Sequence, residues 1–306
     1  MKRRCVMHNK RKIGKWTQLI YLLSIWMFLG TEVQAIQGSS LYREAVQSQR
    51  SFFSALVDSD SEDIDFGFAN DRLEIDLSYD YLNPYGIYGD WTALNFRYYD
   101  KIANDLTILY QASAITRVEG GGFLGAIGAY KGWFDRFYTY TQLSAGTESV
   151  YLPTFRLDQE FNYLFGEHKN IVGLLGFAYI NQFDEHEDFI VSLGLTYYSA
   201  DYNIGYRVFF NESDPGSIKS NTHIISLGVG HEKDQWIYVD VSFGDPSYLS
   251  TITPVYERLS YDMVAVYLKY RKWVNEDSGF YAETGLFELG SEYTKYNFRL
   301  GYFKEF

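Results

Sequence analysis

The chain has 306 residues, a formal net charge of −12, a single cysteine and an unusual abundance of aromatic residues, with 29 Tyr, 23 Phe and 6 Trp. A lone cysteine excludes a disulfide framework or a cysteine-ligated metal centre within the chain. The acidic balance argues against nucleic acid as a partner, because it would repel the phosphate backbone.

Residues 1–35 have the organisation of a secretory signal peptide. Met1–Trp16 is basic and holds no acid, Leu19–Gly30 is apolar, and Val33–Ala35 offers short residues to a signal peptidase. The apolar run is shorter than the roughly 20 residues of a spanning helix, which favours cleavage after Ala35 over a retained anchor. Cleavage discards Cys5 and leaves 20 Lys plus Arg against 38 Asp plus Glu, a net charge of −18.

Residues 36–71 are interpreted as a periplasmic lead-in. Ser40 is a candidate N-cap, and apolar residues recur near helical spacing across Leu41–Val57, which predicts a short amphipathic helix before the acidic linker DSDSED. This helix serves either as a simple lead-in or plug at the barrel mouth, or as a docking element for a partner. The first interpretation is favoured because a single helix carries little specific signal.

From residue 72 to 306 the hydrophobic period changes to two, as in RLEIDLSYDYL, FRLDQEFNYLF, YNIGYRVFF and WIYVDVSF. Soluble sandwiches also alternate. These segments, however, are about ten residues long, carry aromatics near their ends and are joined by connections of alternating length. We therefore predict a transmembrane antiparallel up-and-down β-barrel of about 14 strands, with 12 as the alternative. The strands are expected to begin near residues 73, 92, 106, 124, 137, 155, 171, 189, 202, 222, 236, 261, 279 and 293.

The final segment, YTKYNFRLGYFKEF, continues the alternation to the last residue. Its predicted lipid-facing residues are Tyr296, Phe298, Leu300, Tyr302 and Phe306, with Lys304 as the one break. We interpret the five as the signal that the barrel assembly machinery recognises. Closure also requires this strand to pair with the first, so that no edge faces lipid. The alternative is a secreted protein that happens to end in phenylalanine.

The polar faces of the predicted strands carry charges of both signs. The candidate lumen residues are Arg97, Arg156, Asp158, Glu160, Arg207, Asp240, Lys269, Arg271, Glu283 and Arg299. They line either a charged constriction in a conduit or a salt-bridged plug in a barrel of intermediate width, and the sequence leaves both open. Tyr238, Tyr267 and Tyr281 share these faces and are candidates for stacking on sugar rings.

The histidines do not form an active-site pattern. His168 is predicted in a periplasmic turn and His186 in an outer loop, while His223 and His231 share one face of a strand. No G-x-S-x-G motif occurs. We therefore predict that the protein is not an enzyme and has no catalytic residue and no cofactor.

Two short motifs are interpreted as ordinary loops. DEHED at 184–188 offers carboxylates but lacks the glycine and spacing of a calcium loop, so no metal site is predicted. GGGF at 120–123 has no Lys-Ser/Thr after it, unlike a phosphate loop, and is predicted to be a flexible hairpin tip.

Several segments resemble the YaiO-type outer-membrane β-barrel family. They are YGDW at Tyr88–Trp91, the stretch Tyr138–Tyr163, and YNIGYRVFF followed by Thr222–Gly244. The likeness covers most of Leu73–Phe306. It implies an outer-membrane location, no known enzymatic activity, and a role beside exopolysaccharide synthesis and secretion systems. Some members carry a helical-repeat domain before the barrel, and we expect no counterpart of it here.

The combined hypothesis is an outer-membrane barrel that assists export or surface handling of an exopolysaccharide. The expected partners are outer-membrane lipids and lipopolysaccharide, the barrel assembly machinery, a polysaccharide and a secretion complex. Two alternatives stay open: a structural or surface-interaction barrel without transport, and an outer-membrane lipid-modifying enzyme that uses His186.

Overall fold

The computed structural model describes residues 70–85, 89–117, 120–147, 152–183, 186–245, 247–250, 257–260 and 262–306. The predicted signal peptide and amphipathic helix lie outside these ranges. The described strands are β1 (Arg72–Asn83), β2 (Asp90–Ala103), β3 (Leu106–Arg117), β4 (Gly120–Phe134), β5 (Phe137–Gly146), β6 (Pro153–Phe165), β7 (Ile171–Gln182), β8 (Glu187–Tyr198), β9 (Tyr202–Asp214), β10 (Ile218–His231), β11 (Gln235–Asp245), β12 (Ser247–Ser250), β13 (Glu257–Ser260), β14 (Met263–Trp273), β15 (Ser278–Leu289) and β16 (Tyr293–Glu305).

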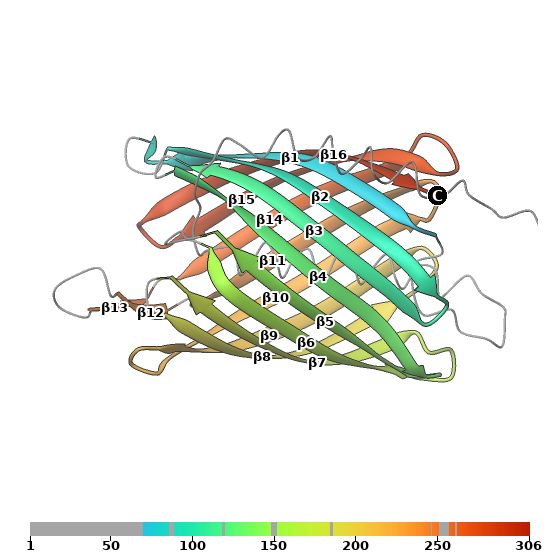
Figure 1. Cartoon of the computed structure of the whole chain (residues 1–306), viewed down its shortest axis with the longest axis horizontal. Coiled ribbons are helices and arrows are strands. Elements are labelled where there is room, and N and C mark those ends of the chain that lie inside the picture. Colours follow the sequence, from blue (N-terminus) through green and yellow to red (C-terminus); the bar gives the residue numbers. More distant parts are fainter. Residues whose placement is uncertain are drawn as a thin grey trace, which may run out of the picture. The chain divides into compact units, whose positions relative to one another are not determined.

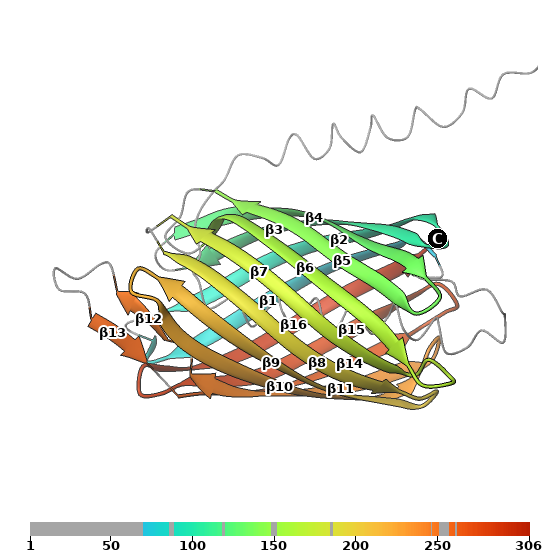
Figure 2. The same cartoon turned by 90° about the horizontal axis from the view of Figure 1, so that it is seen from below.

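Fourteen of these strands form one closed antiparallel barrel, in the order β1-β16-β15-β14-β11-β10-β9-β8-β7-β6-β5-β4-β3-β2. Neighbouring barrel strands follow one another along the chain with two exceptions: the β12–β13 ladder intervenes between β11 and β14, and at closure β1 pairs with β16 from Arg72 opposite Glu305 to Asn83 opposite Thr294. The strands are steeply tilted around the wall (Figures 1 and 2). Closure leaves no barrel strand with an unpaired edge, as a membrane span requires, and the predicted up-and-down barrel of 14 strands is confirmed.

The two ends of the barrel differ in their connections. At the end that carries the C-terminus the strands are joined by turns, of which 166–170 is the longest. At the other end the connection 246–262 joins β11 to β14 and includes the β12–β13 ladder, which lies on the left in Figure 1. Outer-membrane barrels keep short turns toward the periplasm. We therefore name the C-terminal end the periplasmic rim and the opposite end the outer rim.

Three local predictions were wrong. The GGGF segment is part of β4 and not a hairpin tip: Gly121 pairs with Thr116 of β3, because a glycine backbone satisfies the ladder without a side chain. Strand β2 continues through the predicted turn as far as Ala103. The connection after β11, predicted as loop, includes the β12–β13 ladder.

The outward face of the barrel is apolar. Alternate residues of β1, including Ile75 and Leu77, are exposed, and Leu300 of β16 is 70% exposed. Aromatic pairs gather near both ends of this face. Tyr81–Tyr296 lies toward the outer rim, and the pairs Tyr98–Tyr110, Phe137–Phe161 and Phe280–Tyr302 lie toward the periplasmic rim. Rings with polar tips suit the headgroup level, so the two bands mark the membrane boundaries.

The inward face is layered. One aromatic cluster, with Tyr99, Tyr138 and Leu164, lies toward the periplasmic ends of β2 to β8. Another, with Trp91 and Phe287, lies toward the outer ends of β14 to β2. Charged side chains occupy the stretches between such clusters. The predicted lumen residues therefore share the inward face with these aromatic clusters.

Candidate functional site

The structure turns all ten predicted lumen residues inward and buries them. They are Arg97, Arg156, Asp158, Glu160, Arg207, Asp240, Lys269, Arg271, Glu283 and Arg299. Their orientation follows from the strand period of two, because each alternates with a lipid-facing apolar residue. Seven of them fall into two groups on opposite sides of the barrel, one centred on β1 and one on β6.

The first group is a network that converges on two carboxylates of β1. We name it the closure network; its members are Glu74, Asp76, Arg97, Arg271 and Arg299. Glu74 Oε1 lies 3.1 Å from Arg271 Nη1 of β14, and Glu74 Oε2 lies 3.4 Å from Arg97 Nε of β2. Asp76 is paired with Arg97 and lies 3.6 Å from Arg299 Nε of β16. The network therefore links the first strand to both neighbours and to β14 beyond them.

Neutral side chains complete the coordination of Asp76. Asn95 Nδ2 donates to Oδ1 at 2.8 Å, and the Tyr281 hydroxyl donates to Oδ2 at 2.8 Å. The same hydroxyl accepts from Arg97 Nη2 at 2.8 Å. A buried carboxylate is costly unless it is paired and hydrogen-bonded, and Asp76 meets both conditions.

The second group lies on the other side of the barrel. Its members are Arg156, Asp158, Glu160, Arg207 and Ser192, and we name it the β6–β9 network. Arg156 holds Asp158 of the same strand through two hydrogen bonds of 2.7 Å. Arg207 Nη2 of β9 lies 2.6 Å from Glu160 Oε1 of β6 and 2.8 Å from Ser192 Oγ of β8. One pair therefore stays within a strand, while the other spans two intervening strands.

Two inward glycines lie beneath the Arg207 side chain. A Cβ at Gly176 of β7 would lie 3.0 Å from Arg207 Nη2 and would also meet Ser192 Oγ. A Cβ at Gly194 of β8 would lie 3.5 Å from Arg207 Cγ, an ordinary contact. Because Gly176 has no side chain, the Arg207 guanidinium has room to cross β7 and reach Glu160.

The three remaining lumen charges contact a hydroxyl, an arginine and an aromatic ring. Asp240 accepts a 2.5 Å hydrogen bond from Ser226. Arg299 Nε lies 3.9 Å from Glu283 Oε1, and the Lys269 ammonium sits 4.5 Å from the centre of the Tyr281 ring. Both signs are therefore interleaved around the wall, as the sequence predicted.

The three predicted sugar-stacking tyrosines lie inside the barrel but against its wall. Tyr281 is opposite Gly301 and Tyr267 is opposite Gly285, and each ring occupies the space that a glycine Cβ would fill. Tyr238 is placed in the same way against Gly228, at 2.8 Å from the ideal Cβ. One face of each ring is therefore covered by backbone, and Lys269 lies over the Tyr281 ring.

The predicted assembly residues lie on the opposite face. Tyr296, Phe298, Leu300, Tyr302 and Phe306 are all exposed on the outside of the barrel, while Arg299 and Phe303 between them are buried. The placement matches the predicted alternation. Their recognition by the assembly machinery stays a prediction.

The histidines lie apart from one another. His168 is in the periplasmic turn 166–170, and His186 is buried just before β8 at the outer rim. His223 and His231 both project outward from β10; the Nδ1 of His223 lies 2.7 Å from the Tyr206 hydroxyl. Of the DEHED motif, residues 184 and 185 lie outside the described ranges. No cluster of three or more metal-ligating side chains occurs among the described residues.

Sequence reasoning missed the neutral partners and the turn residues. Asn95 and Ser192 were not singled out, because the sequence does not indicate which charged side chain an inward polar residue will contact. Lys233 and Trp273, which line a hollow at the periplasmic rim, were also missed. A turn residue such as Lys233 has no periodicity that would have revealed it.

A closed barrel with an apolar outer face, aromatic bands at the membrane boundaries and a charged interior defines the class of outer-membrane β-barrel proteins. Within that class, the family model described as the YaiO membrane beta barrel domain matches residues 70–249, and the chain belongs to this family. The protein is thus a component of the outer membrane.

Solved structures share the architecture at low identity. A bacterial polysaccharide outer membrane secretin is 9% identical with a TM-score of 0.48, covering 78% of this chain and 98% of its own. Omp33 of Acinetobacter baumannii is 11% identical with a TM-score of 0.46, covering 78% and 99%. The anion-selective porin from Comamonas acidovorans is 9% identical with a TM-score of 0.45, covering 77% and 98%. The similarity concerns the barrel and nothing finer.

No curated protein matches the chain. Within the described residues, no helix has both the length and the apolar character needed to cross a membrane.

Proposed function

We propose that this barrel assists the export or surface handling of a polysaccharide, with the lumen as the contact surface. The observation that carries the proposal is the two inward sets of arginine–carboxylate pairs, with tyrosines on the same face. One set runs from Arg271 through Glu74 to Arg97, and the other runs from Arg156 to Arg207 on the opposite wall. Sugar hydroxyls both donate and accept hydrogen bonds. A wall with both charge signs therefore offers them partners throughout.

The pairing of the charges bears on selectivity. Because each arginine of the two networks has a nearby carboxylate, the wall does not present one dominant sign. Such a lumen supports passage of a hydroxyl-rich solute better than selection of a small ion by charge. Partnership with a secretion complex follows as part of the same proposal.

A structural barrel without transport is the second candidate. The specific observation in its favour is the burial of the paired side chains, which are all less than a tenth exposed. Interlocked ion pairs of this kind also serve to brace a wall.

Single-channel recording in planar bilayers separates the two candidates. The conduit predicts discrete conductance steps that are interrupted when a neutral oligosaccharide is added. It also predicts that Arg156→Glu changes the ion selectivity of the open state. A bilayer with verified inserted protein, no conductance and no sugar effect favours the structural barrel.

A further inference from the structure

A hollow of about 760 Å³ lies at the periplasmic rim, outside the two lumen networks. It is lined by Asn70, just before β1, by Lys233 from the β10–β11 turn, by Trp273 and the β14–β15 turn, and by the end of β16. Cavities of this size accommodate small-molecule or oligomeric ligands. Four parts of the chain that are distant in sequence therefore build one concave site.

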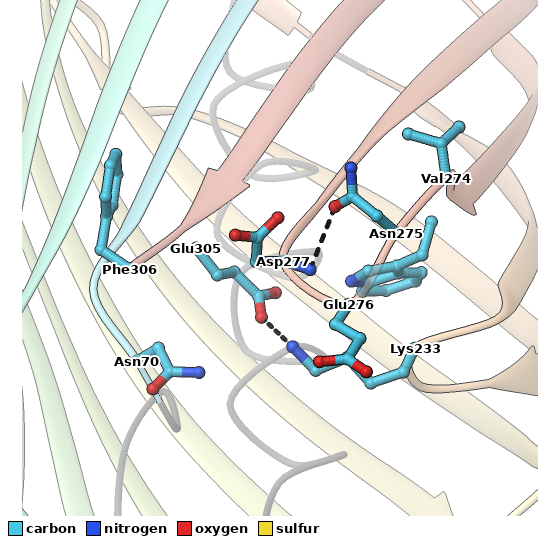
Figure 3. A pocket seen from close by; sticks show the side chains of 9 residues that line it. Asn70, Lys233, Val274, Asn275, Glu276, Asp277, Glu305 and Phe306 are labelled. Atoms are coloured by element: carbon cyan, nitrogen blue, oxygen red, sulfur yellow. Dashed lines mark hydrogen bonds and ion pairs between the residues drawn. The ribbon is translucent and has the colours of Figure 1, made fainter.

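The lining is polar and acidic. Glu276, Asp277 and Glu305 supply three carboxylates, of which Glu305 is paired with Lys233 and Asp277 with Lys304, while Glu276 has no ion pair with a described residue. Figure 3 shows Glu305 and Glu276 turned toward Lys233, with the dashed line marking the Lys233–Glu305 ion pair. The amide of Asn275 is already engaged, since its Oδ1 accepts from the Ser278 backbone at 2.9 Å. The Glu276 carboxylate, left over after this pairing, disfavours an anionic ligand and accommodates hydroxyl or ammonium donors.

Trp273 adds a donor without an acceptor. Its side chain is 4% exposed and lines the hollow. Its ring contacts Phe303 edge-on at 4.9 Å, yet within the described part of the chain no group accepts a hydrogen bond from the indole Nε1. A buried N–H without a partner costs about 1–3 kcal/mol. The donor is closed to solvent, so a ligand oxygen reaches it only after the Trp273 ring turns toward the hollow, and that contact would recover part of the cost.

We propose that the rim hollow is a saccharide-binding site that takes a short segment of an uncharged or amine-bearing sugar chain. The choice of a saccharide among hydroxyl-rich ligands rests on the proposed function. Sugar hydroxyls donate to the carboxylates of Glu276 and Glu305, a ring oxygen or hydroxyl accepts from Trp273 Nε1, and the exposed Val274 and Phe306 offer apolar contact. The position places the site where a chain would enter the barrel from the periplasm.

The test is titration calorimetry on the full-length protein in detergent with three probes of similar length: a neutral malto-oligosaccharide, a cationic chitosan oligomer and anionic oligogalacturonate. We expect the first two to bind and the third not to bind. Trp273→Phe keeps the ring but removes the donor and should weaken binding about five- to tenfold, the worth of one hydrogen bond.

Trp236→Phe is the matched control. Trp236 is equally buried in the same aromatic cluster and also has an Nε1 without an acceptor among the described residues, but it does not line the hollow. It should bind like the wild type. If Trp273→Phe fails to fold, Glu276→Gln replaces it, and loss of the preference for the cationic over the neutral probe is expected.

The proposal is overturned if none of the three probes binds, if oligogalacturonate binds best, or if the two tryptophan variants behave alike. These outcomes are independent of the conduit. A barrel that binds saccharide at the rim but shows no conductance would contradict the proposed conduit alone. A barrel that conducts, with sugar block unchanged and no probe binding at the rim, would contradict the rim site alone.

Discussion

The two charged networks of the lumen use the same residue types in different ways. In the closure network, Asp76 and Glu74 of one strand are shared by three arginines from three other strands. In the β6–β9 network, Arg156 is held by Asp158 of its own strand and only Arg207 crosses to another. The comparison suggests that the two networks have different roles. The first network braces the pairing of the chain's two terminal strands, and the second lines the wall.

The largest expected effect comes from breaking the closure network. Asp76→Asn leaves Arg97 and Arg299 with one counter-charge fewer, and removing one partner of a buried pair typically costs about 3–5 kcal/mol. We expect a loss of this size in the free energy of unfolding, measured by urea titration of the protein in lipid vesicles.

Asp158→Asn is the matched substitution on the opposite wall. It deprives one arginine rather than two and touches no strand-to-strand link, so its loss should be clearly smaller. Equal losses for the two variants would contradict the distinction between the networks.

The second effect concerns the glycine under Arg207. Gly176→Ala puts a Cβ 3.0 Å from Arg207 Nη2 and against Ser192 Oγ. We expect overpacking that displaces the Arg207 side chain to destabilise the barrel by about 1–3 kcal/mol, measured by the same titration. Gly194→Ala is the control, because its Cβ makes only ordinary contacts from 3.5 Å. If Gly194→Ala were as destabilising as Gly176→Ala, the contact between Arg207 and Glu160 would not depend on the missing side chain at Gly176.

The third effect is on permeation and not on stability. Arg156→Glu places a third carboxylate beside Asp158 and Glu160 on one wall. The cation-to-anion permeability ratio should rise several-fold, as expected when a ring of one charge sign is created. The reversal potential in a salt gradient measures it. An unchanged ratio in a conducting variant would place this wall outside the ion path.

The smallest effect is on pH dependence at the periplasmic rim. Lys304 hydrogen-bonds Asp277 and holds the pKa of that exposed carboxyl below its usual 3.8. A lowered pKa in the folded state gives stability that is complete above pH 3.8 and is lost as the pH falls through the lower, folded value. Asp277→Asn should therefore lower the free energy of unfolding by a constant amount above about pH 4, and the gap to the wild type should close as the pH falls below that value. A gap that changes with pH between pH 5 and 7 would contradict this assignment.

Most of the correct predictions came from the period-two alternation of apolar and polar residues along the strands. Alternation fixed the inward orientation of residues as distant as Arg97 and Glu283, and the starts of β7 at Ile171, β9 at Tyr202 and β16 at Tyr293 agree with the expected positions. The glycine-rich start of β4 was wrongly predicted to be a turn. Glycine is common in turns, but its backbone can also form the hydrogen bonds of a β-ladder.

The sequence could not predict which side chains make contact between strands, for a geometric reason. Which inward residues meet depends on the register and tilt of the closed barrel, so the reach of Arg207 over two strands to Glu160 is not encoded by spacing along the chain. The rim hollow depends on turns that only closure brings together, such as those of Lys233 and Glu276. The face on which a residue lies therefore follows from the local sequence, whereas the contacts that build a site depend on the closed fold.

The central claim is that the charged and tyrosine-lined lumen admits a sugar chain. The most direct measurement is the uptake of a labelled neutral oligosaccharide into proteoliposomes that contain the wild-type barrel. The account predicts uptake well above that of protein-free liposomes, and slower uptake with Arg156→Glu and Arg207→Glu combined, in a variant shown to be folded. Uptake no faster than in protein-free liposomes, with correctly inserted protein, would contradict it.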